Sequence, residues 1–268
     1  MLVRFGSLEL DGLVHAVTTR AGGVSPAPWD TLNMSWSRPD DPAHVLENRR
    51  RVCAALEIPL SRLAQAPQIH GAGVGIVPAD DAGRGATGRD SLLPANDGLI
   101  TDAPDVYLLA CFADCVPLLF FDPARPAVGV AHAGWRGTVA GMATAMVRAF
   151  VTQWGTCPAD LRVVIGPSIG PCCYQVGLAV VDAARAALPG AEELFSRVDG
   201  SAAHFDLWQA NRASLLRAGV LAEHIETSGL CTMHHAADFF SHRAERGNTG
   251  RFAAIIGLRP PQGQANHG

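Results

Sequence analysis

The sequence contains no lysine, so all 21 of its basic residues are arginine. Lysine side chains form Schiff bases with carbonyl substrates, attach pyridoxal phosphate, and complete the P-loop that binds nucleoside triphosphates. The absence of lysine therefore excludes these three kinds of site. Any phosphate group that this chain binds must be held by arginine side chains or by backbone N–H groups.

Three further absences narrow the class of protein. Apart from the arginine triplet at 49–51, basic residues form no large patch, so nucleic acid is not an expected partner. No uncharged apolar run reaches the length of a membrane span, and the first residues carry charges where a signal peptide has its apolar core, so no membrane is expected either. The seven cysteines show no disulfide-type spacing, which predicts a reducing cytoplasm.

The composition is that of a globular protein, with 48% hydrophobic residues and a net charge of −4 over 268 residues. Continuous apolar runs predict strands buried on both faces at 106–115, 117–122, 127–134, 161–167 and 251–258. Helical patterns occur at 40–59, 138–154, 176–188 and 206–219. Strands and helices are interspersed without a long linker, so we expect one layered α/β domain over 1–268, with mixed β-sheets flanked by helices.

Several residues predict where the helices begin and end. Asp41 is a candidate N-cap, with Pro42 at the first helical position. Gly219 is a candidate left-handed residue just after a helix. Gly134 interrupts a predicted strand, and we expect the next helix to begin at Thr138.

The sequence GRGATG at 83–88 has the G-x-G-x-x-G spacing of dinucleotide-binding loops. Such a loop needs a strand before it and a helix after it, and the flanking residues here favour neither. The segment therefore predicts a surface loop rather than a nucleotide site.

Three potential metal ligands lie at or near the ends of apolar segments: His70, Cys115 and His132. Strand ends are where α/β sheets build their sites. Two imidazoles and one thiolate suit Zn²⁺, with a fourth coordination position left for water as in catalytic sites. From spacing alone, two core histidines and a buried cysteine are the simpler explanation, because no local zinc-finger spacing is present.

The same three residues allow other chemistry. Cys115 is a candidate nucleophile with His132 as its base, as in cysteine amidases. A set of two histidines and one cysteine also occurs in blue-copper centres. A multicopper oxidase needs many paired histidines at H-x-H spacing, and none of the ten histidines is spaced in this way. We therefore do not expect an oxidase.

Polar residues near these ligands are further candidates. Asp114 lies in an apolar run where a carboxylate needs a partner or a function, so it either orients a ligand or transfers protons. Arg136 and the N–H groups before Thr138 form a candidate anion site. Arg243 lies in a turn-rich segment from which it could reach an anionic or polar ligand.

Two further groups of cysteine and histidine residues are not expected to take part in the chemistry. Cys172 and Cys173 follow a Gly/Pro-rich turn, and we expect them to be packed rather than reactive. Most of the histidines at 234, 235 and 242 are expected on the surface.

Seven segments carry a resemblance to a known family: TTRAGGVS, QIHG, ADCVPLL, AHAGWRG, IGPSIGPCCYQVG, CT at 231–232 and FFSHR…TGR. In this order they resemble the laccase-domain purine nucleoside phosphorylases, also known as multicopper polyphenol oxidoreductases. The resemblance runs from about Thr18 to Ile256. It implies a layered α/β fold like that of a cysteine hydrolase, with its core at about 18–258. It also implies a metal site at the three candidate ligands, with Zn²⁺ expected and copper as an alternative.

The resemblance implies phosphorolysis of adenosine, inosine and methylthioadenosine, with adenosine deamination as a second activity. Cys115, Asp114 and His132 are then the expected catalytic residues. The residues expected to contact nucleoside or phosphate are Arg49, Arg136, Arg243 and Asn33. Some members are described instead as peptidoglycan editing amidases that remove L-Ser from a UDP-muramyl precursor. A binding protein with a structural metal is a further alternative, although the sequence offers no convincing fourth ligand for such a site.

Overall fold

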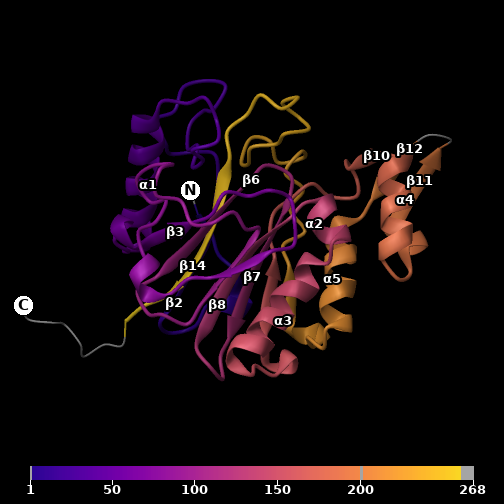
Figure 1. The fold of residues 1–268 in the computed structure, drawn as a ribbon. Coiled ribbons are helices and arrows are strands. Elements are labelled where there is room, and N and C mark those ends of the chain that lie inside the picture. The colour runs from indigo at the N-terminus through magenta and orange to yellow at the C-terminus, as the bar shows by residue number, and fades with distance from the viewer. Residues whose placement is uncertain (1, 200–201, 261–268) are drawn as a thin grey trace, which may run out of the picture.

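The computed structural model describes residues 2–199 and 202–260, which form three β-sheets and five α-helices (Figure 1). The five-stranded sheet has the order β1 (Leu2–Val3), β2 (Leu13–Thr18), β14 (Phe252–Leu258), β6 (Tyr107–Phe112) and β3 (Leu63–Gln65). The six-stranded sheet has the order β13 (Ile225–Thr227), β9 (Arg162–Ile165), β7 (Val116–Asp122), β8 (Ala127–Ala133), β5 (Gly98–Thr101) and β4 (Val74–Ile76). The three-stranded sheet has the order β10 (Gln175–Gly177), β12 (Ala202–Phe205) and β11 (Phe195–Asp199).

The two larger sheets are mixed, as the sequence predicted. Parallel pairs join β3 to β6, β4 to β5 and β13 to β9, and the remaining pairs are antiparallel. The helices are α1 (Pro42–Leu56), α2 (Trp135–Val139), α3 (Met142–Trp154), α4 (Leu178–Ala187) and α5 (Leu207–Arg217). Among the described residues, no helix is both long enough and apolar enough to cross a lipid bilayer.

Three hydrophobic cores define the layers of the molecule. One core lies between α1 and the five-stranded sheet and includes Val52 and Leu109. The central core lies between the two larger sheets and includes Phe112 and Val130. The third includes Phe150 and separates the six-stranded sheet from α3 and α5. Both large sheets are therefore covered on both faces, with α1 at one end of the stack and α3 and α5 at the other (Figure 1).

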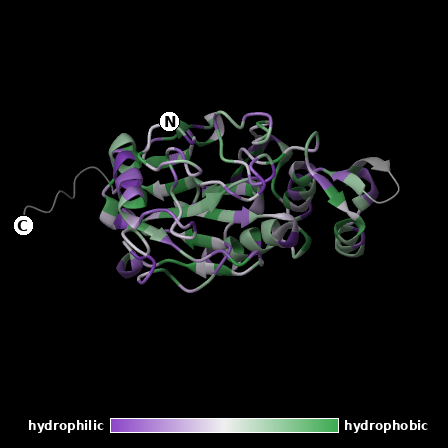
Figure 2. Cartoon of the chain, turned by 90° about the horizontal axis from the view of Figure 1, so that it is seen from above, coloured by the Kyte–Doolittle hydropathy of each residue, from purple (hydrophilic) through white to green (hydrophobic). Residues whose placement is uncertain are grey.

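Burial on both faces explains the continuous apolar runs. Every residue of β6, β7 and β8 is buried, which confirms the prediction for strands without polar alternation. Seen from above, the inner strands are largely hydrophobic, and hydrophilic stretches lie on α1 and in the outer loops (Figure 2).

The helix signals were correct in two places and wrong in one. Asp41 caps α1 by accepting a hydrogen bond from the N–H of Ala43, and Gly219 adopts φ +98° after α5. The helix expected from Thr138 begins three residues earlier, because Gly134 is itself the N-cap of the short helix α2. Gly141, with φ +84°, then separates α2 from α3.

Candidate metal centre and its cavity

The chain passes twice from the five-stranded to the six-stranded sheet at the same end of the stack. The first passage, from β3 to β4, carries His70, and the second, from β6 to β7, carries Asp114 and Cys115. His132 lies near the end of β8, opposite Pro117 of β7. Three residues far apart in the sequence therefore meet where the two sheets are joined.

The ligand atoms of His70, Cys115 and His132 all lie within 4.8 Å of one another. The two imidazole rings meet edge to face, with centroids 4.8 Å apart. Gly134 leaves room for this cluster, because a Cβ at that position would lie 2.8 Å from the sulfur of Cys115. His70 and Asp114 adopt φ values of +63° and +84°, which non-glycine residues rarely do. The structure thus brings together the three residues predicted as ligands.

Asp97, immediately before β5, organises the cluster and was not found from the sequence. Its carboxylate lies 2.9 Å from Nδ1 of His132, which leaves Nε2 of that ring to face the cluster. The same carboxylate accepts hydrogen bonds from the backbone N–H groups of Ile69, His70 and Gly71. One buried carboxylate therefore orients one histidine and fixes the loop that carries the other, as carboxylates do beside metal-binding histidines.

The electrostatics of the cluster favour a thiolate. Burial by itself would raise the pKa of Cys115, but the charge of His132 and hydrogen bonds from both histidines outweigh it and lower this pKa to about 6. Burial would likewise lower the pKa of His132, yet the Cys115 charge and the hydrogen bond to Asp97 raise it to about 9. At neutral pH the metal-free cluster is a thiolate–imidazolium pair, and a thiolate is the form of cysteine that binds metals.

Asp114 has its two carboxylate oxygens engaged by other parts of the chain. Oδ1 accepts a hydrogen bond from the Thr232 hydroxyl at 2.7 Å, and Oδ2 accepts one from the backbone N–H of Arg243 at 2.6 Å. Its backbone carbonyl accepts from the N–H of Ile169. These bonds hold three other segments against the loop before Cys115, which explains why a carboxylate is tolerated in this apolar run.

The cluster opens into a cavity of about 590 Å³. Positive charge dominates its lining, and Asp114 is the only carboxylate among the described residues that line it. Two of the predicted arginines are present: Arg136 stacks over the ring of Trp135, and Arg243 lies over the ring of Tyr174. The sequence did not reveal the other arginines of the lining, which are Arg38, Arg89 and Arg251.

Two residues predicted to bind substrate do not line this cavity. Arg49 is fully buried, and its guanidinium donates hydrogen bonds to the carbonyls of Met34 and Gly85 and to the Gln65 side chain. Asn33 is also fully buried and donates to the Asp40 carboxylate. Both support the loops behind the cavity, so the structure gives no support to a contact with substrate.

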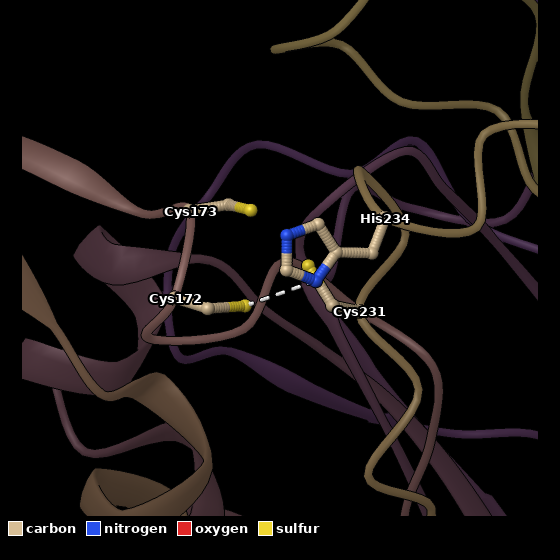
Figure 3. Close-up of side chains that lie close together, drawn as sticks. All are labelled: Cys172, Cys173, Cys231 and His234. Atoms are coloured by element: carbon tan, nitrogen blue, oxygen red, sulfur yellow. Dashed lines mark hydrogen bonds between the residues drawn. The ribbon is translucent and has the colours of Figure 1, made fainter.

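The expectation that Cys172 and Cys173 are packed is wrong for Cys172, whereas Cys173 does pack against the core beside the six-stranded sheet. Cys172 is exposed and Cys173 is half-buried, and both sulfurs lie near Cys231 and His234 (Figure 3). The prediction failed for Cys172 because the turn at 171–173 presents this side chain to solvent. The GRGATG segment does form a loop without a following helix, as predicted.

Comparison with protein-family models gives a match over residues 14–259 to the family described as multi-copper polyphenol oxidoreductase laccase. The chain belongs to this family. The match covers every residue of the cluster and of its cavity.

Relatives within this laccase-like family include proteins named purine nucleoside phosphorylase. One from Geobacillus stearothermophilus, YlmD, is 45% identical over 96% of this chain and 94% of its own length. A human protein of that name, LACC1, is 34% identical over 94% of this chain and 57% of its own length.

Solved structures of the family confirm the fold. The crystal structure of YlmD from Geobacillus stearothermophilus is 43% identical and superimposes with a TM-score of 0.92, covering 97% of this chain and 96% of that one. A Bacillus licheniformis protein named YfiH, at 41% identity, gives a TM-score of 0.91 over 94% of both chains. The layered α/β architecture is therefore that of the family.

Proposed function

We propose that this chain is a zinc-dependent purine nucleoside phosphorylase. One observation carries the proposal: the cluster of His70, Cys115 and His132 lies in a cavity lined by five arginines and one carboxylate. A positively charged cavity suits an anionic co-substrate such as phosphate. The family relatives named purine nucleoside phosphorylase support the phosphorylase part of this proposal.

The arginines of the lining differ in their exposure. Arg136 and Arg243 are exposed at the cavity wall and each lies against an aromatic ring, although NH1 of Arg243 also donates to the Gln175 carbonyl. Arg251 is half-buried, and its NH1 already donates to the carbonyls of Thr249 and Gly250. We therefore assign phosphate binding to Arg136 and Arg243, and Arg251 adds to the positive potential of the cavity.

The remaining lining offers surfaces for a nucleoside. The aromatic rings of Trp36, Trp135 and Tyr174 provide apolar faces for a purine base. His242 also lines the cavity, and burial together with the charge of Arg251 lowers its pKa. Its ring is therefore neutral at pH 7 and is able to accept a hydrogen bond from a ribose hydroxyl or from the base.

The donor set fits zinc. Two imidazoles and a thiol of lowered pKa are borderline to soft ligands of the kind that Zn²⁺ prefers, and three protein ligands leave a position open for substrate or water. A bound Zn²⁺ would supply Lewis acidity in the cavity and would lower the pKa of nearby water. Asp97 keeps His132 in the orientation that such binding requires.

Phosphorolysis requires a phosphate oxygen to attack C1′ of the ribose while the bond from C1′ to the purine breaks. The arginines would hold the phosphate, and the aromatic faces would hold the base, so that the two meet in the cavity. Adenosine, inosine and methylthioadenosine are the substrates we propose, with deamination of adenosine as a second activity. All three nucleosides share the purine and ribose that the lining would contact.

A second candidate function rests on a specific observation. Cys115, His132 and Asp97 form a nucleophile, base and orienting carboxylate in the order used by cysteine hydrolases. Without a metal, this set would suit an amidase, and the removal of L-Ser from a peptidoglycan precursor is the candidate reaction. A bound metal would occupy the same sulfur, so the two functions are separated by their response to chelation.

One experiment tests both candidates. Zinc-loaded protein is incubated with adenosine or inosine, with and without phosphate, and the products are separated by chromatography. Release of free base and ribose 1-phosphate that requires phosphate, and that chelation abolishes, supports the phosphorylase. In a parallel assay, release of L-Ser from a UDP-muramyl precursor that survives chelation but is lost on alkylation of Cys115 would instead support the hydrolase.

We also propose a cytoplasmic location. All seven cysteines are free thiols, which persist in a reducing compartment.

A further inference from the structure

Four metal-type side chains gather at a second position, on the loops that follow two neighbouring strands. Cys172 and Cys173 lie in the turn after β9, and Cys231 and His234 lie in the turn after β13. Because β9 and β13 are parallel, the chain leaves both strands at the same end of the sheet. A bridge between Ser168 and Cys231 continues the pairing toward the cluster.

We propose that Cys172, Cys173, Cys231 and His234 form a second metal site, which binds Zn²⁺ through three thiolates and one imidazole (Figure 3). One sulfur or ring-nitrogen atom from each residue lies within 4.8 Å of the others. Three cysteines with one histidine are a usual ligand set of structural zinc sites, which are closed by four protein ligands. The cluster described above has three, so the two sites differ in kind.

The spacing of the ligand atoms agrees with tetrahedral coordination. The sulfur of Cys172 lies 3.6 Å from Nδ1 of His234. With Zn–S and Zn–N bonds of about 2.3 and 2.1 Å, a sulfur and a nitrogen on a tetrahedral ion are about 3.6 Å apart, and two sulfurs about 3.8 Å. The observed pair therefore already has the separation that an ion between them would impose.

The surroundings of the cluster also suit a metal. The backbone N–H of Gly170 points at the sulfur of Cys231 at 3.3 Å, and such N–H groups stabilise thiolates that bind metals. Cys231 is buried, whereas Cys172 and His234 are exposed, so an ion can enter from solvent and still be covered on one side. The three cysteines are free thiols.

This site would join a segment that lines the cavity to a segment that holds one of the lining residues. Tyr174 follows Cys173 and lines the cavity. Thr232 follows Cys231 and donates its hydroxyl hydrogen to Asp114. The ion would thus hold the loops that carry Tyr174 and Thr232 in place without contacting substrate. The inference does not depend on the proposed reaction.

Metal analysis of the full-length protein tests this site. Wild-type protein purified under reducing conditions is expected to bind about two equivalents of zinc per chain, one at each cluster. Cys172→Ser and His234→Gln change exposed residues, so the fold should be kept, and each should lose about one equivalent. Cys115→Ser should lose the other, and Cys157→Ser, at an exposed cysteine outside both clusters, should lose none.

Cobalt substitution identifies the ligands directly. Thiolate-to-cobalt charge-transfer absorption grows with the number of thiolates on the ion, so Cys115→Ser should retain the three-thiolate spectrum and Cys172→Ser should weaken it. Thermal unfolding should shift to lower temperature in Cys172→Ser and also in wild-type protein treated with chelator.

Two results would overturn the proposal. The first is a single zinc equivalent in the wild type that is lost in Cys115→Ser and kept in Cys172→Ser. The second is an intact mass lower by the mass of two hydrogen atoms, with a disulfide mapped to Cys172, in protein kept under reducing conditions.

Discussion

Replacing Asp97 by asparagine tests whether this carboxylate organises the metal cluster. The change keeps the shape of the side chain but substitutes an NH₂ group for one acceptor oxygen. Four donors converge on the carboxylate: the ring of His132 and the N–H groups of residues 69, 70 and 71. An asparagine can accept from one side only, so about half of these donors lose their acceptor.

The expected loss of stability follows from that count. Each unsatisfied donor costs about 1–3 kcal/mol, and the loop at 69–71 is exposed enough for water to replace part of it, so we expect about 2–4 kcal/mol for Asp97→Asn. Zinc affinity should fall roughly tenfold to a hundredfold, because the orientation of His132 is no longer fixed. Urea unfolding at pH 7 and competition with a zinc chelator measure the two effects. Asp102→Asn, at an exposed aspartate beyond the other end of β5, is the matched control.

The stability difference should also depend on pH. Burial raises the pKa of Asp97, but hydrogen bonds from His132 and from the N–H of Gly71 outweigh it, and the pKa lies below its usual value. A carboxyl group of this kind stabilises the folded protein above its unfolded pKa of about 3.9, and the stabilisation is lost as the pH falls through the lower folded pKa. The gap between wild type and Asp97→Asn should therefore narrow below about pH 4. Equal stability and equal zinc affinity at pH 7 would refute the organising role.

Four other predictions concern single residues. In metal-free protein, alkylation of Cys115 by iodoacetamide should accelerate through about pH 6, with exposed Cys157 as the internal reference, and zinc should protect Cys115. Gly134→Ala should weaken zinc binding with little loss of thermal stability, because its Cβ would lie 2.8 Å from the Cys115 sulfur; unchanged affinity would contradict the crowding argument. Arg136→Ala should raise the KM for phosphate roughly tenfold to a hundredfold, which corresponds to a contact of about 1.5–3 kcal/mol, and should affect deamination less; equal effects on both activities would assign it to the fold or the nucleoside. Arg49→Met should destabilise the protein by about 3–5 kcal/mol in urea unfolding and leave the phosphate KM little changed, because its buried donors hold backbone carbonyls.

The sequence determined the strands of the interior, because burial on both faces requires apolar residues at every position and leaves no polar alternation. β6, β7 and β8 were visible for this reason. It also determined the cap of α1, because the Asp41 carboxylate needs only a backbone N–H two residues away. Local chemistry of this kind depends on spacing alone.

The ligand triad was predicted from residue types at strand ends and from the family resemblance, and the structure brought the three side chains together. Asp97 could not be found in the same way. Its only local signal is an aspartate before a short strand, and its role depends on the register that places β5 beside β8. Long-range register decides which carboxylate meets which histidine.

Tertiary structure alone decided the difference between the arginines. Residue type does not distinguish Arg49 from Arg136. Arg49 is buried behind the cavity and donates to backbone carbonyls, whereas Arg136 is exposed and stacks on Trp135 at the cavity wall. It likewise decided the second cluster, since Cys172 and His234 are 62 residues apart and meet only because β9 and β13 are parallel neighbours. Residue types determine which side chains can bind a metal ion or an anion, whereas the packing of distant segments determines which of them share one site.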